Sequence, residues 1–130
     1  MKTYFNLLNF MVFLFILIGC SPTTIIINEN NLKEKYSLRK GDIVEVILNA
    51  NPSTGYKWDI VTVDTVKVKI VDETYTAKTV NENIVGSGGT KIYHFKAINK
   101  GSTVIELNYY RPFEKELPPN KKFYVNLEIK

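Results

Sequence analysis

Residues 121–129 read Lys-Lys-Phe-Tyr-Val-Asn-Leu-Glu-Ile, and the order of side chains in this stretch decides the fold. Every second residue is apolar, and these residues are Phe123, Val125, Leu127 and Ile129. In an extended strand, residues two positions apart point to the same face, so the stretch has one apolar face and one polar face. Such alternation predicts a β-strand with one face in a core and the other in solvent.

The same period of two recurs upstream, between turns that contain Gly, Asn and Asp. The strands predicted there cover residues 43–48, 56–60, 66–70, 93–97 and 105–109. The three isoleucines at 25–27 are expected to begin the first strand. After Cys20, no stretch of ten or more residues repeats its apolar side chains every 3.6 positions. The pattern therefore predicts no long amphipathic helix.

These strands indicate an all-β chain. Six or seven strands in about a hundred residues favour an immunoglobulin-like antiparallel β-sandwich, because each sheet then covers the apolar face of the other. A small closed barrel is the structural alternative. Trp58 is predicted to fill the middle of the core. His94, which alternates with Tyr93 and Phe95, is predicted to be a solvated surface residue.

The N-terminal residues are interpreted as an export signal. Residues 10–18 are apolar without interruption, but as a helix they span only about 14 Å, against roughly 30 Å for the hydrocarbon core of a bilayer. Residues 1–19 are therefore predicted to be a signal peptide of the lipoprotein type rather than a membrane span. The stretch Leu17-Ile18-Gly19-Cys20 resembles the lipobox of prokaryotic lipoproteins, in which the cysteine is acylated after cleavage.

Cys20 is accordingly the predicted lipidation site. Two acyl chains are expected to hold the exported protein on the outer face of a prokaryotic cell membrane, or on an outer membrane. Residues 20–31 then form a lipidated tether running into the first strand, and residues 32–130 form the sandwich domain. The alternative interpretation is an ordinary secretory peptide followed by an incidental buried cysteine.

Composition excludes several classes of function. The chain has 130 residues, with 17 Lys and Arg against 13 Asp and Glu, and loss of Lys2 with the signal leaves a net charge of +3. These charges form no clustered basic stripe, so nucleic-acid binding is not expected. One cysteine and one histidine exclude a disulfide scaffold and a Cys-based zinc site. We therefore expect a monomer that is not an enzyme and that holds no metal or cofactor.

Three predicted loops contain residues that a simple turn does not need. They are Asn51-Pro52-Ser53-Thr54-Gly55, Gly86-Ser87-Gly88-Gly89 and Arg111-Pro112-Phe113. Proline and glycine stiffen the first loop, and glycines let the backbone of the second approach another surface closely. Arginine and aromatic side chains, as in the third, are enriched at binding hot spots. Immunoglobulin-like strand order places all three loops at one end of the sandwich.

Together, the three motifs resemble those of chagasin-like inhibitors of papain-family cysteine peptidases. The first motif continues as Tyr56-Lys57-Trp58, the second ends at Thr90 and the third at Glu114. The resemblance covers about residues 32–130. It implies an immunoglobulin-like sandwich that blocks a papain-family cysteine peptidase reversibly and without a covalent bond, by occluding the active-site cleft with three adjacent loops.

The resemblance also implies a place for each motif. Ser53 and Thr54 would lie against the catalytic cysteine and histidine of the peptidase, the backbone of residues 86–89 would lie along the substrate cleft, and Arg111 and Phe113 would contact the surface beside it. The family usually has threonine in place of Ser53 and often tryptophan in place of Phe113, and both departures reduce apolar contact. The alternative function is an immunoglobulin-like surface or adhesion module of a lipoprotein, without inhibitory activity.

Overall fold

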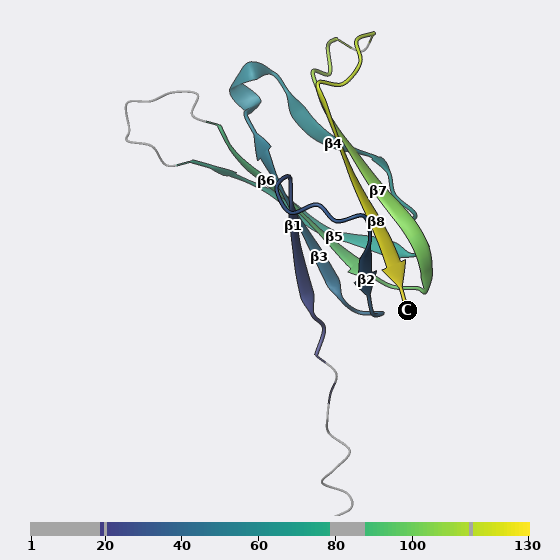
Figure 1. Ribbon diagram of the computed structural model, residues 1–130. Helices are drawn as coiled ribbons and strands as arrows, with labels where there is room; N and C mark the ends of the chain where they lie inside the picture. Colours follow the sequence, from purple (N-terminus) through teal and green to yellow (C-terminus); the bar gives the residue numbers. More distant parts are fainter. Residues whose placement is uncertain (1–18, 20, 79–87, 115) are drawn as a thin grey trace, which may run out of the picture.

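The computed structural model describes residue 19 and residues 21–78, 88–114 and 116–130 (Figure 1). Eight strands make up most of the described residues. The strands are β1 (Thr24–Asn28), β2 (Tyr36–Leu38), β3 (Ile43–Ala50), β4 (Lys57–Thr62), β5 (Val68–Ala77), β6 (Gly89–Ala97), β7 (Gly101–Tyr110) and β8 (Lys121–Ile129). One turn of 3-10 helix (Pro52–Thr54) lies between β3 and β4. No helix in these residues is long and apolar enough to cross a membrane.

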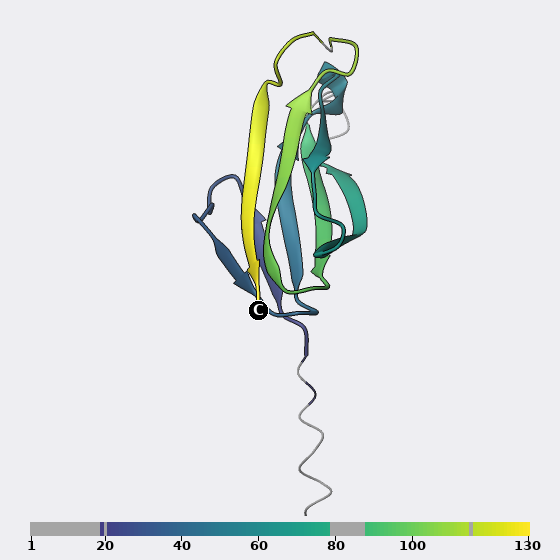
Figure 2. The same ribbon diagram turned by 90° about the vertical axis from the view of Figure 1, so that its right-hand side faces the viewer.

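The strands form the two layers of the predicted sandwich. One sheet has the order β1-β3-β6-β5 and the other the order β2-β8-β7-β4 (Figures 1 and 2). Two edge pairs, β1 with β3 and β2 with β8, are parallel, so the expectation of purely antiparallel sheets is wrong in this detail. The period of two in the sequence shows which face of a strand is buried, but it does not show the strand's direction.

The core lies between the two sheets and follows the alternation of the sequence. Phe123, Val125, Leu127 and Ile129 are all buried, as predicted. Trp58 is only 4% exposed, and its indole N–H donates to the carbonyl of Asn49 (2.9 Å). Within the described residues, the buried apolar core begins at Ile27 and ends at Ile129. A chain that starts at Ser21 therefore contains every residue of this core.

β5 departs from the predicted alternation. Val66 lies outside the strand and Ile70 is exposed, so only Val68 of the three predicted inward residues is buried. β5 is the edge strand of its sheet, and its register with β6 shifts between Ile70 and Asp72. Ile70 still lies opposite the buried Phe95, so its exposure comes from its place at the edge of the sheet. The extra residue after it moves only the following side chains to the other face.

His94 is not simply solvated, in contrast to the prediction. Its ring lies between two carboxylates on neighbouring strands, with Nδ1 at 2.5 Å from Asp72 and Nε2 at 3.3 Å from Glu45. Partial burial alone lowers the pKa of this imidazole, but the hydrogen bonds to the two carboxylates outweigh it, so the pKa of His94 is raised. The strand register that joins β5, β6 and β3 brings these three residues together.

The sandwich has two distinct ends. One end, which we call the loop pole, holds residues 51–56, Gly88, residues 111–114 and residues 116–120. The opposite end, which we call the tether pole, holds residues 21–23, the turn at 39–42, the turn at 98–100 and Lys130 (Figure 1). Odd-numbered strands run from the tether pole toward the loop pole, and even-numbered strands run back.

Candidate functional site

The loop between β3 and β4 is stiff, as its sequence predicts. Pro52 begins the 3-10 turn, and Gly55 ends it in the left-handed region (φ 80°), which a residue without a side chain adopts most easily. The hydroxyl of Thr54 donates to the carbonyl of Asn51 (2.6 Å), and the hydroxyl of Ser53 donates to the Asn51 side chain. Ser53 and Thr54 are both exposed at the end of this central loop.

The glycines at the start of β6 lie against the central loop and β5. A Cβ on Gly88 would lie 3.2 Å from the carbonyl oxygen of Ala50 and 3.6 Å from the Cβ of Asn51. A Cβ on Gly89 would overlap the carbonyl of Thr76 and lie 2.6 Å from the hydroxyl of Tyr75. The close approach of the backbone that the sequence predicts for these glycines therefore occurs within the domain itself. Gly86 and Ser87 lie outside the described residues.

The loop between β7 and β8 contacts the central loop on its other side. The Nε of Arg111 donates to the carbonyl of Thr54 (3.1 Å), and its Nη1 pairs with Glu114 (3.2 Å). Phe113 is 71% exposed, yet its ring edge lies so near Gly55 that a Cβ there would be 3.1 Å away. The described residues of all three predicted motifs are thus adjacent at the loop pole.

A row of stacked side chains connects the core to this site. Ring centroids are 5.0 Å apart for Trp58 and Tyr109, and 5.2 Å apart for Tyr109 and Tyr56. The guanidinium of Arg111 continues the row, at 4.5 Å from the Tyr56 ring centroid and 5.9 Å from that of Phe113. We call these five residues the aromatic stack. It extends from a buried indole to an exposed phenyl ring, and each contact of this kind stabilises the arrangement modestly.

Sequence reasoning missed Tyr109, which holds the first residue of the central loop. Its hydroxyl accepts a hydrogen bond from the backbone N–H of Asn51 at 2.9 Å. The alternation along β7 predicts that Tyr109 points inward, and a buried tyrosine needs a partner for its hydroxyl. That signal indicates a hydrogen bond, but it does not identify Asn51, which lies 58 positions away in the chain. The central loop is therefore held at Asn51 by Tyr109 and at Thr54 by Arg111.

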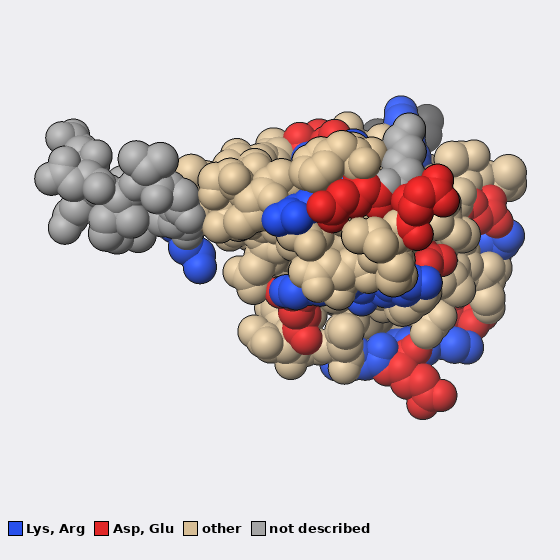
Figure 3. Space-filling model, turned by 90° about the horizontal axis from the view of Figure 1, so that it is seen from above, with Lys and Arg blue, Asp and Glu red and all other residues tan. Residues whose placement is uncertain are grey.

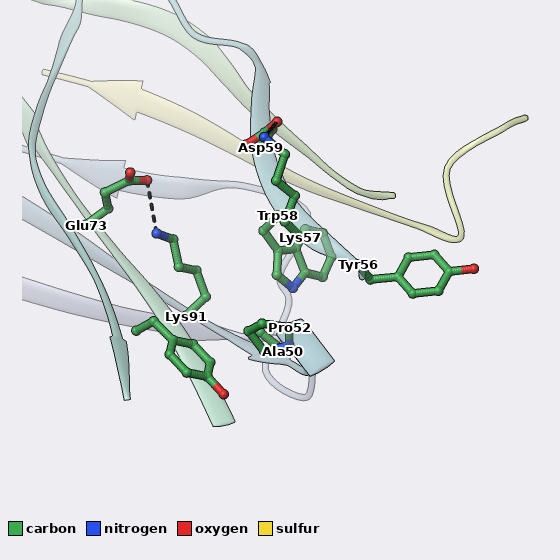
Figure 4. Close-up of a pocket in the computed structure, with 9 residues that line it drawn as sticks. Ala50, Pro52, Tyr56, Lys57, Trp58, Asp59, Glu73 and Lys91 are labelled. Atoms are coloured by element: carbon green, nitrogen blue, oxygen red, sulfur yellow. Dashed lines mark ion pairs between the residues drawn. The ribbon is translucent and has the colours of Figure 1, made fainter. Parts of the chain in front are cut away.

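A cavity of about 300 Å³ opens beside the central loop, between β4 and the β5–β6 pair. Figure 4 shows Trp58 and Pro52 on one side and Glu73 and Lys91 on the other, and the last two form an ion pair (3.3 Å). The carboxylate of Asp59 pairs with Lys57 (2.7 Å) and raises the pKa of that ammonium group. Each charge that lines the cavity therefore has an opposite partner.

The site offers surfaces for binding rather than groups for catalysis. It presents backbone, small hydroxyl side chains, one arginine and several aromatic rings. Viewed onto the loop pole, Figure 3 shows acidic and basic side chains intermingled around it. Among the described residues, no group of three His, Cys, Asp or Glu side chains has an arrangement that could hold a metal ion. The arrangement is a ridge of adjacent loops that can enter a cleft on another protein.

Comparison with known proteins identifies the family. The sequence model of one protein family, described as chagasin family peptidase inhibitor I42, matches residues 37–127, which is more than half of the chain. The chain belongs to the chagasin family of peptidase inhibitors. This family carries protein inhibitors and not enzymes, in agreement with the functional class that the sequence predicts.

The relatives of this chagasin-family chain include proteins of Entamoeba histolytica. Amoebiasin-2 is 28% identical over 121 residues, covering 91% of this chain and 98% of the relative, and Amoebiasin-1 is 34% identical over 89 residues, covering 67% and 82%. A crystal structure of the cysteine protease inhibitor EhICP2 from the same organism superposes with a TM-score of 0.77 at 27% identity. That match covers 86% of this chain and all of EhICP2.

Proposed function

We propose that this chain inhibits papain-family cysteine peptidases reversibly, by inserting the loop pole into the active-site cleft. The residues proposed to contact the peptidase are Asn51, Pro52, Ser53, Thr54, Gly55, Gly86, Ser87, Gly88, Gly89, Arg111, Pro112 and Phe113. The observation that carries the proposal is the convergence of the three loops, in which Gly88 lies against Asn51 and Arg111 bonds to Thr54. The match to a family of peptidase inhibitors and the similarity to the cysteine protease inhibitor EhICP2 support the choice of a cysteine peptidase.

The geometry also explains how such a loop can bind without being cut. A papain-family nucleophile needs a scissile carbonyl held at the correct distance and angle for attack. The central loop forms a 3-10 turn whose backbone N–H groups at Thr54 and Gly55 already bond to Asn51 and Pro52. It therefore does not present the extended backbone of a substrate, and its rigidity lowers the entropy lost on association.

The direct test is titration of active papain with a chain of residues 21–130, followed by mass spectrometry of the inhibitor. We expect stoichiometric inhibition at low enzyme concentration and recovery of the intact chain. The matched pair is Phe113→Ala and Leu117→Ala, because both side chains are exposed on the same loop (71% and 61%). We expect Phe113→Ala to weaken inhibition by roughly tenfold to a hundredfold, equivalent to about 1–3 kcal/mol, and Leu117→Ala to leave it nearly unchanged.

Full activity of Phe113→Ala would contradict its proposed contact with the peptidase, and undisturbed papain in excess wild-type chain would contradict the proposal as a whole. Undisturbed papain is the result expected if the chain is instead an immunoglobulin-like adhesion module. Neither the family match nor the loop geometry favours that alternative. Nucleic acid is not expected as a partner, and the chain is proposed to act as a monomer.

We propose in addition that the chain is exported and anchored by acylation at Cys20, on the outer face of a cell membrane or on an outer membrane. The support is the sequence Leu17-Ile18-Gly19-Cys20, since Cys20 itself lies outside the described residues. The chain enters the sandwich at the tether pole, so such an anchor would leave the loop pole facing away from the membrane (Figure 1).

Expression of the full chain in a bacterial host, with a radiolabelled fatty acid, tests the anchor. We expect label on the wild-type protein, loss of residues 1–19 and recovery in the membrane fraction. Cys20→Ser should remove the label while leaving the sandwich unchanged. An unlabelled wild-type protein in the soluble exported fraction would instead support an ordinary secretory peptide.

A further inference from the structure

Charge is distributed very unevenly between the tether pole and the rest of the domain. The tether pole and the strand ends beside it carry seven cationic side chains, which are Arg39, Lys40, Lys67, Lys69, Lys96, Lys100 and Lys130. Three carboxylates, Asp42, Asp64 and Glu128, accompany them, which gives a net charge of +4. The rest of residues 21–130 contains nine cations and ten carboxylates and has a net charge of −1. The net positive charge of the domain is thus located at this end.

The three carboxylates at the tether pole already have partners. Glu128 pairs with Lys35 (3.1 Å) and accepts a hydrogen bond from the hydroxyl of Ser102 (2.9 Å). Asp42 is 5% exposed and accepts hydrogen bonds from the backbone N–H groups of Thr23 and Arg39, which lower its pKa. The guanidinium of Arg39 lies 3.8 Å from the same carboxylate. Asp64 pairs with Lys67. Among the described residues, no carboxylate pairs with the five remaining lysines.

A hollow of about 220 Å³ lies within this basic region. Its lining residues are Ser21, Pro22, Arg39, Lys40, Gly41, Asp42 and Lys96. Ser21 and Pro22 are the residues through which the chain enters the sandwich, so the hollow lies directly beside the start of the tether. With Asp42 neutralised by Arg39, Lys40 and Lys96 provide uncompensated positive charge around this hollow.

The strand register places two lysines directly opposite each other next to the hollow. Lys69 of β5 is directly opposite Lys96 of β6, and both are exposed. Like charges directly opposite on adjacent strands destabilise a sheet. An anion bound beside Lys69 and Lys96 would reduce this repulsion.

From these observations we propose that the tether pole docks on an anionic membrane surface, with a lipid phosphate headgroup in the hollow between Lys40 and Lys96. A membrane is the partner that fits, because the charges surround the point where the chain leaves toward its proposed anchor. A basic patch contributes to membrane binding in addition to an acyl anchor. Docking in this way fixes the domain with the loop pole pointing outward, which rests on the proposed function of that pole.

The test uses the unacylated chain of residues 21–130, which contains the whole core, so its result does not depend on acylation. Binding is measured by sedimentation with vesicles of phosphatidylglycerol and phosphatidylcholine, and with vesicles of phosphatidylcholine alone. We expect binding to the anionic vesicles only, weakened by added salt. The variant Lys40→Gln/Lys96→Gln/Lys100→Gln should lose roughly a hundredfold in partition coefficient, since each basic side chain near such a surface contributes about fivefold.

The matched control is Lys33→Gln/Lys121→Gln/Lys122→Gln, which removes the same charge away from the tether pole. It should keep most of the binding, and equal loss in both variants would overturn the proposal because it would show an effect of net charge alone. Absence of binding to anionic vesicles, or binding of inorganic phosphate in the hollow without vesicle binding, would also overturn it. If the free chain inhibits papain but the vesicle-bound chain does not, the proposed outward orientation of the loop pole is wrong. If the free chain does not inhibit papain, the proposed function is wrong.

Discussion

The two poles of the sandwich are built from different interactions. At the loop pole, neighbouring segments touch through backbone and rings, as when Gly88 lies against Asn51 and Phe113 lies against Gly55. At the tether pole, the cationic side chains are long and all but Lys67 are exposed, and Gly41 has nothing within 4 Å of the position where its Cβ would be. The loop pole is therefore defined by shape and the tether pole by charge.

This difference indicates what each pole can recognise. A rigid ridge of backbone and aromatic rings is suited to one complementary cleft, because little conformational entropy remains to be lost on binding. Flexible lysines are suited to a diffuse anionic surface, where position matters less than the number of charges. Changes in side-chain volume should accordingly affect the loop pole more than the tether pole.

The largest expected effect comes from adding one methyl group at each pole. Gly89→Ala places a Cβ against the Thr76 carbonyl and the Tyr75 ring, so backbone must shift, and we expect it to lower the free energy of unfolding by about 3 kcal/mol. Gly41→Ala meets open space and only the strain of a positive φ (97°), at a cost of about 1 kcal/mol. Denaturant unfolding followed by Trp58 fluorescence measures both.

The papain inhibition constant separates the poles further, since Gly89→Ala should weaken inhibition and Gly41→Ala should not. Equal stability of the two variants would show that the region around Gly89 adapts freely. That result would contradict the view that close contact fixes the loop pole.

The sandwich could be predicted from the sequence because the alternation of apolar and polar residues shows which side chains of each strand face the core. Phe123 and its partners on β8 show this most clearly, since each predicted inward side chain is buried. The pattern could not reveal the parallel pairing of β1 with β3, because strand direction depends on where the chain crosses between sheets. It also predicted that Ile70 is buried, but the alternation of a strand does not show that the strand lies at the edge of its sheet, where Ile70 is exposed.

The candidate site was predictable as three motifs but not as a contact network. Pro52 and Gly55 are local signals, since a proline or a glycine restricts or frees its own backbone. The hydrogen bond from Asn51 to Tyr109 and the stacking of Arg111 on Tyr56 join residues far apart in the chain. The approach of His94 to Glu45 and Asp72 likewise depends on the register of three strands.

An intermediate effect is expected from removing a single oxygen at the loop pole. Tyr109→Phe keeps the ring in the aromatic stack but leaves the N–H of Asn51 without its partner, at a cost of about 1 kcal/mol in stability. Because the central loop then loses the hydrogen bond from Tyr109 to its first residue, we expect inhibition of papain to weaken by roughly fivefold to tenfold. We also expect slow cleavage of the chain within residues 51–55, detected by mass spectrometry.

The control for Tyr109→Phe is Tyr124→Phe, which removes the hydroxyl of an exposed tyrosine (46%) on β8. It should change neither the stability nor the inhibition constant. If Tyr109→Phe lowers stability but leaves the inhibitor uncut and equally potent, Tyr109 only supports the fold and does not position the central loop.

The smallest effect is expected between the poles, at His94. Because the two carboxylates raise its pKa in the folded state above the ordinary value of about 6.5, folding favours the protonated ring. Its contribution to stability is fully present below about pH 6.5 and is lost as the pH rises through the folded-state pKa. His94 is the only histidine, so denaturant unfolding at several pH values should show this decline in the wild-type chain and a flatter profile in His94→Gln. At each pH, the wild-type chain and His94→Gln should inhibit papain equally, because His94 contacts neither pole. A pH-dependent difference in their inhibition constants would show that the middle of the sheet is coupled to the loops.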